Sequence, residues 1–269
     1  MQITQINIYP VKSLRGITLH STIVEPRGLQ YDRRWMLVDE QGLFLTQREF
    51  PEMALLVTEI NDHHLVIKHS YKSYEPLLIP LKATAPAERV RVQVWNDHCH
   101  ALAVSPFADQ WLSEVLQTPC RLVYMPDDSV RPTDPLYSQP SDMVSFADGF
   151  PILIIGEASL EDLNQRLKIP VPMNRFRPNL VFSGGKPYEE DTWKNFQIGN
   201  LHFRGTKTCG RCEITTIDQA TAERGSEPLK TLASYRLEGK RILFGMNVCW
   251  NVEETTNACL SIGDSIKIL

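Results

Sequence analysis

The motif Cys209-Gly-Arg-Cys212 contains the residues best suited to chemistry in this sequence. A Cys-x-x-Cys pair alone is compatible with a redox dithiol, with half of a zinc site, or with one reactive thiolate beside a structural neighbour. Two half-buried cysteines without a chemical role are the plain alternative. A four-cysteine zinc site needs a second close pair, which the other cysteines do not form. Lys207 and Arg211 flank the motif, and their positive charges favour a thiolate that acts as a soft-metal ligand or a nucleophile.

The residues after Cys212 bear on the dithiol interpretation. A thioredoxin-like motif lies at a strand-to-helix junction. Residues 213–217, Glu-Ile-Thr-Thr-Ile, are instead typical of a strand. The sequence therefore favours one functional thiolate in this motif over a redox pair, and the spacing does not say which of the two cysteines carries it.

Basic residues form short islands at predicted strand ends and loops. Arginine offers a planar fork of donors that binds phosphate, and loops at strand ends can bring distant islands together. Each island taken singly is typical of a solvated surface. The islands are Lys12 and Arg15, Arg33 and Arg34, Arg48, Arg175 and Arg177, and Lys207 and Arg211.

The composition excludes several classes of protein. The 269 residues carry a formal net charge of −4, and the pI near 6.0 argues against a dedicated nucleic-acid partner, so any anion site must be local. We find no G-x-S-x-G elbow, P-loop or G-x-G-x-x-G motif, so hydrolase, kinase and dinucleotide-binding interpretations lose their usual support.

The distribution of apolar residues and cysteines predicts the compartment. The longest apolar run, residues 150–155, is far shorter than the ~18 residues that a membrane span requires. The N-terminus lacks the pattern of a secretory signal. Six cysteines are too few for a disulfide scaffold. We therefore expect a cytoplasmic protein with reduced thiols and no membrane partner.

Many short strands and few helices predict a mostly-β (α+β) fold. Helices are expected over residues 107–116, over 159–167 and from 228, and a proline-rich loop over 126–140 joins two halves. Without regular alternation of strands and helices, a β-barrel is favoured over a doubly wound sheet. The expected strands are 3–9, 35–39, 43–46, 55–60, 65–69, 90–94, 100–104, 151–155, 180–183, 195–203, 213–218, 248–251 and 265–269.

Taken together, an ordered series of motifs resembles the MOSC family. More closely, the chain is similar to bacterial relatives of the mitochondrial amidoxime-reducing component. The series spans nearly the whole chain, and its order is more specific than any single motif. The motifs are Tyr-Pro-Val-Lys-Ser (9–13), Asp-Arg-Arg-Trp (32–35), Thr-Gln-Arg (46–48), Phe-Ala-Asp-Gly-Phe-Pro (146–151), Asn-Arg-Phe-Arg-Pro-Asn (174–179) and Cys-Gly-Arg-Cys-Glu-Ile-Thr-Thr-Ile-Asp (209–218).

The resemblance implies a fold, a cofactor and a set of site residues. An N-terminal MOSC β-barrel-like domain, residues 1–122, would interlock with a MOSC domain, residues 123–269. The implied cofactor is the molybdenum cofactor, with Cys212 as catalytic residue and protein ligand of the metal, a soft donor suited to molybdenum. Gly210 departs from relatives that carry a serine there. The residues implied to hold the pterin and its phosphate are Lys12, Ser13, Arg33, Arg177 and Asn179, with Arg48, Arg175 and Arg211 added by proximity to the motifs.

The implied activity is two-electron reduction of N-hydroxylated compounds such as amidoximes, hydroxylamines and N-hydroxylated bases. The electrons would come from a separate reductase or ferredoxin-type partner, because the spacing of a plant-type ferredoxin module is absent. Two alternatives remain open. One is a sulfur or molybdenum-cofactor carrier that uses a Cys212 persulfide or thiolate, since MOSC domains also occur in molybdenum cofactor sulfurases. The other is a dithiol reductase that uses both Cys209 and Cys212.

Overall fold

The computed structural model describes residues 1–82, 87–251 and 258–269, and strands dominate these ranges. This confirms the predicted mostly-β fold with a few helices. Within these ranges no helix is long and apolar enough to cross a bilayer. The helices are α1 (Pro106–Leu116), α2 (Glu157–Arg166) and α3 (Leu229–Ala233), with short 3-10 helices η1 (Pro51–Leu55), η2 (Met173–Arg175), η3 (Glu189–Thr192) and η4 (Glu213–Thr216).

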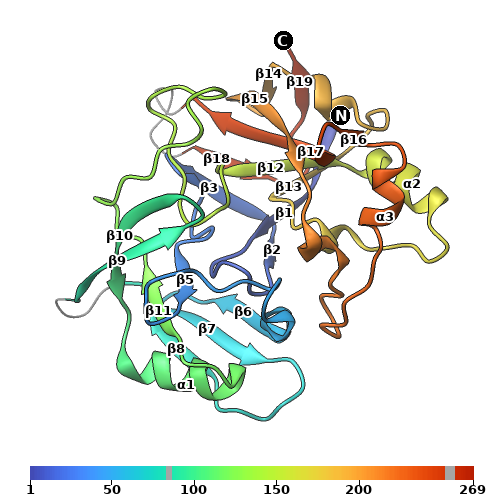
Figure 1. The fold of residues 1–269 in the computed structure, drawn as a ribbon. Helices are drawn as coiled ribbons and strands as arrows, with labels where there is room; N and C mark the ends of the chain where they lie inside the picture. The colour runs from blue at the N-terminus through green and yellow to red at the C-terminus, as the bar shows by residue number, and fades with distance from the viewer. Residues whose placement is uncertain (83–86, 252–257) are drawn as a thin grey trace.

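One large sheet organises the C-terminal half, and the start of the chain belongs to it (Figure 1). Nearly all of its neighbouring strands are antiparallel, with one parallel pair between β12 and β13. The strands in spatial order are β19 (Ile266–Ile268), β14 (Asn195–Ile198), β15 (Leu201–Gly210), β17 (Arg241–Trp250), β12 (Ile152–Gly156), β13 (Leu180–Ser183), β1 (Gln2–Ile8) and β2 (Ile17–Leu19), with β16 (Leu237–Glu238) beside β17.

Strand β1, which is next to last in this order, also meets the chain segment beside β19, and this contact closes the sheet into a barrel. Gln2 forms a bridge with Ser265 next to β19. The amide N–H of Ile3 donates to the carbonyl oxygen of Asp264 at 2.9 Å, and that of Gly263 donates back to Ile3 at 2.8 Å. Closure removes open sheet edges and encloses an apolar core. Its largest fully buried aromatic side chains are Phe182, Phe196 and Phe203.

Two of the smaller sheets and helix α1 belong entirely to the N-terminal half. Ser105 caps α1 by accepting a hydrogen bond from the Ala108 N–H at 3.1 Å, and Pro106 occupies the first helical turn, where no donor is needed. Leu112 and Val115 on α1 are buried against these sheets. The strands are β5 (Trp35–Val38), β11 (Arg121–Tyr124), β10 (Asp97–Ala103) and β9 (Arg89–Val94) in one sheet, and β6 (Leu56–Ile60), β7 (His64–His69) and β8 (Leu77–Pro80) in the other.

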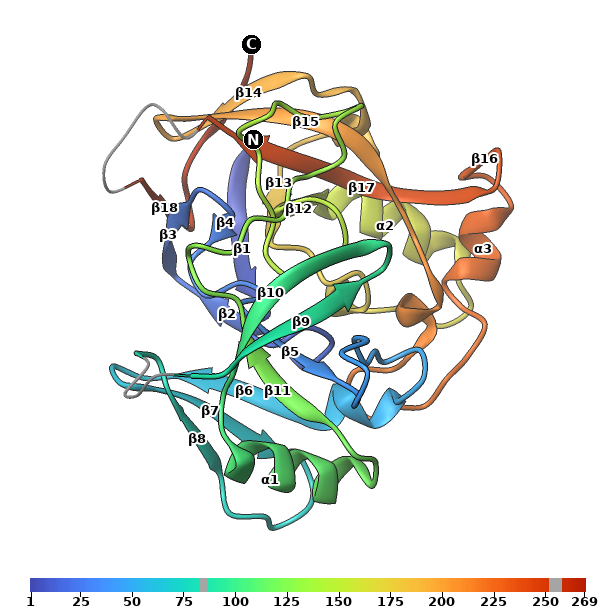
Figure 2. The same cartoon turned by 60° about the vertical axis from the view of Figure 1, so that its left-hand side comes forward.

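The two halves are interlocked, as predicted, because strands from each half pair with strands of the other. Strands β1 and β2 come from the start of the chain but lie in the large sheet, and β18 (Cys259–Ser261), near its end, pairs with β3 (Ser21–Glu25). Strand β4 (Gly28–Leu29) completes that small sheet. Figure 2 shows the large sheet above, and β6, β7, β8 and α1 below. The boundary at residue 122 stays a prediction.

Three segments predicted as single strands have a different secondary structure. Residues 43–46 make two isolated bridges instead of a strand. The predicted strand 195–203 is two strands, β14 and β15, which reverse at Gly199 with φ 57°. Residues 213–216 form the 3-10 helix η4. The hydroxyls of Thr215 and Thr216 donate to the backbone carbonyls of Cys212 and Glu213, at 3.0 and 2.8 Å, and these local bonds favour a turn over a strand.

Candidate functional site

A cavity lies where the two halves of the chain meet, and it gathers most of the residues that the sequence pointed to. The loop after β1, the turn before β5, the loop after η2 and the end of β15 all contribute to its wall. Seven of the nine predicted site residues line it. They are Lys12, Ser13, Arg33, Arg177, Asn179, Arg211 and Cys212.

Three of the lining residues have a backbone conformation that residues other than glycine rarely adopt. The φ angles are 68° at Ser13, 50° at Arg33 and 55° at Arg177. Such a left-handed conformation costs roughly 1–3 kcal/mol per residue, and it clusters at functional sites where the surrounding structure holds it. The concentration of three such residues at one cavity marks it as a candidate binding site.

Tyr9 holds the side chains of Arg33 and Arg177 in place, and Asn179 holds that of Arg33. The guanidinium groups of Arg33 and Arg177 lie 4.3 and 4.2 Å from the centre of the Tyr9 ring. Arg33 also pairs with Asp32 and donates to the Asn179 side-chain oxygen at 2.9 Å. The same oxygen accepts from the Leu153 N–H at 3.1 Å, so Asn179 ties Arg33 to strand β12. Burial raises the pKa of Tyr9 to about 12, so its hydroxyl stays protonated and donates to the Pro178 carbonyl.

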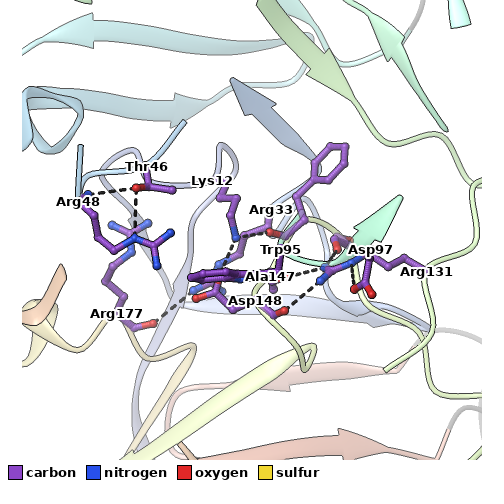
Figure 3. A network of polar contacts seen from close by, with 12 residues as sticks. Lys12, Arg33, Thr46, Arg48, Trp95, Asp97, Arg131, Ala147, Asp148 and Arg177 are labelled. Carbon is purple, nitrogen blue, oxygen red and sulfur yellow. Dashed lines mark hydrogen bonds and ion pairs between the residues drawn. The ribbon is translucent and has the colours of Figure 1, made fainter. Parts of the chain in front are cut away.

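Lys12 reaches across the boundary between the halves to Asp148. Its ammonium group donates to the Phe146 carbonyl at 2.8 Å and to the Asp148 carboxylate at 2.5 Å (Figure 3). The indole N–H of Trp95 donates to the same carboxylate oxygen at 3.2 Å. Partial desolvation beside Lys12 would raise the pKa of Asp148, but the positive charge of Lys12 and its hydrogen bond outweigh this effect and hold the pKa well below its usual range. Asp148 is therefore a carboxylate at neutral pH.

Cys212 opens helix η4 at the wall of the cavity. Its backbone carbonyl accepts from the Thr215 N–H at 3.2 Å, which holds the first turn in place. The side chain is half-buried, and within residues 1–82, 87–251 and 258–269 its sulfur makes no hydrogen bond. The thiol is thus left available to a ligand inside the cavity.

Arg211 and Cys209 form a second contact at the same wall. One guanidinium nitrogen of Arg211 donates to the Cys209 sulfur at 3.0 Å, and another donates to the Phe176 carbonyl at 2.6 Å. The third, Nε, is buried and finds no hydrogen-bond partner among residues 1–82, 87–251 and 258–269. Cys209 lies at the end of β15, so the structure places the two cysteines in different settings.

The remaining two predicted residues lie outside the cavity wall. The Arg48 guanidinium stacks over the exposed ring of Trp95 at 4.2 Å, at the tip of the hairpin of β9 and β10 (Figure 3). Arg175 lies behind η4, where it donates to the Thr215 carbonyl at 2.9 Å and pairs with Asp218 at 3.1 Å. These contacts make Arg175 a support for the segment that carries Cys212.

The cavity carries an excess of positive charge. Lys12 and Arg33 have the carboxylate partners described above, whereas Arg177 and Arg211 form no ion pair among the described residues. Burial lowers the pKa of Arg177 to about 10, which leaves it protonated at neutral pH. Two unpaired guanidinium groups in one cavity are suited to an anion such as a phosphate.

The residues present fit a cofactor that brings its own metal. Among the described residues, no three His, Cys, Asp or Glu side chains lie close enough to hold a metal ion together. A metal at Cys212 would therefore take its other ligands from a bound group. The cavity offers one soft sulfur, which suits a metal already bound by sulfur. Beside it lie the guanidinium groups of Arg177 and Arg211, including the buried Nε of Arg211, which suit a phosphate on the same bound group.

Asp148, Tyr9 and the pair Gln47 and Gln219 were not among the predicted site residues. Asp148 lies in the motif of residues 146–151, and Tyr9 opens the motif of residues 9–13, so motif membership was the available signal. Gln219 lies in no motif, and only the fold brings it against Gln47.

Comparison with known proteins agrees with this geometry. The sequence matches the MOSC N-terminal beta barrel domain over residues 1–119 and the MOSC domain over residues 141–267. It is 34% identical to "Mitochondrial amidoxime-reducing component 1" of Mus musculus, over 99% of this chain and 82% of the relative. The human protein of that name is 32% identical over the same shares.

A second group of relatives is much longer. "Molybdenum cofactor sulfurase" of Solanum lycopersicum is 31% identical over 98% of this chain, which spans 35% of that protein. The matches to both domains and to full-length relatives show that the chain belongs to the family of MOSC-domain proteins.

Proposed function

We propose that this protein binds the molybdenum cofactor in the cavity between its halves and reduces N-hydroxylated compounds there. The observation that carries the proposal is the sulfur of Cys212, which makes no hydrogen bond in the part of the chain that the structure describes. The same cavity holds Arg177 and Arg211, two cations without an ion pair among those residues. Relatives named as amidoxime-reducing components support the reaction class.

The protein residues divide the work of binding. Cys212 would supply the thiolate ligand of the metal, with η4 fixing its backbone. Arg177 and Arg211 would bind the phosphate by charge-assisted hydrogen bonds, while Lys12, Ser13 and Arg33 would hold the pterin. Asn179 keeps Arg33 in place through the hydrogen bond at 2.9 Å. When bound, the cofactor supplies the two-electron redox chemistry.

The reaction breaks the N–O bond of the substrate, consumes two electrons and two protons, and releases water. Asp148, held as a carboxylate by Lys12, would accept a hydrogen bond from the N–H or O–H of the substrate at the cavity wall. A separate electron-transfer protein, such as a reductase or ferredoxin-type partner, would supply the electrons. The cytoplasmic location stays a prediction.

Reduction of an amidoxime with a chemical electron donor tests this function. We expect the wild-type protein, purified from a host that makes the cofactor, to form the amidine, and Cys212→Ser to lose at least tenfold of that activity. Cys209→Ser is the matched control and should retain most of it. Equal losses in the two variants would favour the dithiol reductase instead.

The second candidate is a sulfur or cofactor carrier, favoured by the sulfurase relatives that match 98% of this chain. A carrier of this kind would hold a persulfide on Cys212. Mass spectrometry of the intact protein then shows an added sulfur that disappears with Cys212→Ser and with reductant. The reductase proposal predicts no such addition.

A further inference from the structure

Two buried glutamines join the halves of the chain beside the cavity without lining it. Gln47 belongs to the N-terminal half and is 0% exposed, and Gln219 follows η4 in the C-terminal half and is 3% exposed. Burying a polar amide costs free energy unless its hydrogen bonds are made. The hydrogen bonds that the two amides make therefore decide whether their burial is tolerated.

The two amides bind each other reciprocally. Nε2 of Gln47 donates to Oε1 of Gln219 at 3.2 Å, and Nε2 of Gln219 donates to Oε1 of Gln47 at 2.9 Å. The second N–H of Gln47 donates to the Ser13 carbonyl at 2.6 Å, and that of Gln219 to the Ile217 carbonyl at 3.2 Å. All four amide N–H groups are thus used, and rotating either amide would bring like groups together.

The same pair connects two residues of the cavity wall. Gln47 holds the backbone of Ser13, and Oε1 of Gln219 accepts a hydrogen bond from Nη1 of Arg177 at 3.5 Å. Ser13 and Arg177 belong to different halves and both have left-handed backbones. A strained conformation persists only where surrounding contacts hold it, and this pair supplies one such contact to each residue.

We propose that Gln47 and Gln219 act as one unit of positioning residues, which sets Ser13 against Arg177 and so assembles the anion-binding part of the cavity from the two halves. The proposal rests on the proposed function only for the identity of the anion. If the proposal is right, replacing either glutamine changes anion binding in the cavity, although neither side chain lines it.

The affinity of the full chain for inorganic phosphate tests the proposal. The protein is purified from a host that lacks the cofactor, and binding is measured by calorimetry below the unfolding temperature of each variant. We expect Gln47→Met and Gln219→Met each to weaken binding by about two- to tenfold, the effect of losing one neutral hydrogen bond. Gln110→Met, on the exposed face of α1, is the matched control and should bind as the wild type does.

The double variant tests whether the amides act as a unit. Because loss of one amide already frees the other, Gln47→Met with Gln219→Met should bind phosphate no more weakly than the weaker single variant. A further variant, Gln219→Glu, keeps a hydrogen-bond acceptor for Arg177 but places a negative charge beside it. Because that charge repels phosphate, Gln219→Glu should weaken phosphate binding more than Gln219→Met does.

Several outcomes would overturn the proposal. Phosphate affinity equal to the wild type in both single variants, even with lower thermal stability, assigns the pair a purely structural role. Additive losses in the double variant show that the amides act separately. Molybdenum content of the same proteins from a cofactor-making host separates the two claims: a wild type without molybdenum refutes the proposed function, while the phosphate results still decide the role of the glutamines.

Discussion

Lys12 donates a 2.5 Å hydrogen bond to Asp148, a residue 136 positions away in the other half of the chain. Lys12 is buried, whereas the side chain of Asp148 is 62% exposed. The contact therefore links the halves at the edge of the cavity while leaving the carboxylate open to a ligand. It also lowers the pKa of Asp148, which makes the link dependent on pH.

Asp148→Asn should lower the free energy of unfolding at pH 7 by about 1 kcal/mol or less, since the carboxylate is exposed. A carboxyl whose pKa is lowered on folding contributes stability above its unfolded pKa of about 3.9, and loses it as the pH falls through the lower folded pKa. Urea unfolding from pH 7 to pH 3 checks this. The difference between wild type and variant should hold down to about pH 4 and shrink below it; a difference that grows toward acid contradicts the link.

Arg177→Gln and Arg48→Gln should differ in their effect on cofactor content. Arg177 lies in the cavity wall and forms no ion pair with any residue that the structure describes, whereas Arg48 stacks on Trp95 outside the wall. We expect Arg177→Gln to retain less than a third of the wild-type molybdenum after gel filtration, because a charged hydrogen bond is worth about 1.5–3 kcal/mol. Arg48→Gln should retain most of it. Equal losses would place the phosphate site nearer to Arg48.

Ser13→Gly should separate the backbone strain at Ser13 from the contribution of its hydroxyl to cofactor binding. Glycine adopts a φ of 68° at little cost, so the variant should gain up to about 1 kcal/mol in the free energy of unfolding. It should also bind the cofactor less well, since the hydroxyl is lost. Ser13→Ala, which keeps the strain, is the matched control. Chemical denaturation measures the first effect, and a destabilised glycine variant would show that Ser13 is not strained.

Arg175→Met should loosen the segment that carries Cys212. It removes the hydrogen bonds to the Thr215 and Glu227 carbonyls and the ion pair with Asp218. Leaving such buried acceptors without a donor costs about 1–3 kcal/mol. Urea denaturation should show that loss, and a maleimide should modify Cys212 faster than in the wild type. Unchanged labelling of Cys212 would contradict a supporting role for Arg175.

Much of the site could be predicted from the sequence, because the motif series marked short loops that the fold then brings together. Lys12, Arg33 and Arg177 are distant in sequence yet line one cavity. The local structure after Cys212 could not be predicted from residue type: Ile214 and Thr215 favour strands, but the threonine hydroxyls bond to the backbone and Arg175 holds the Thr215 carbonyl.

The positions of Arg175 and the glutamine pair also lay beyond sequence reasoning. An arginine two positions from Arg177 is expected to share its role, but Arg175 is the last residue of η2 and its side chain lies behind η4. Gln47 and Gln219 are 172 positions apart, and only the interlocking of the halves brings their amides into contact.

Molybdenum per protein, measured for wild type, Cys212→Ser and Cys209→Ser from a host that makes the cofactor, tests the central claim most directly. We predict near-stoichiometric molybdenum in the wild type and in Cys209→Ser, and a lower or chemically altered content in Cys212→Ser. No molybdenum in the wild type, despite a competent host, would contradict the account and favour the sulfur carrier.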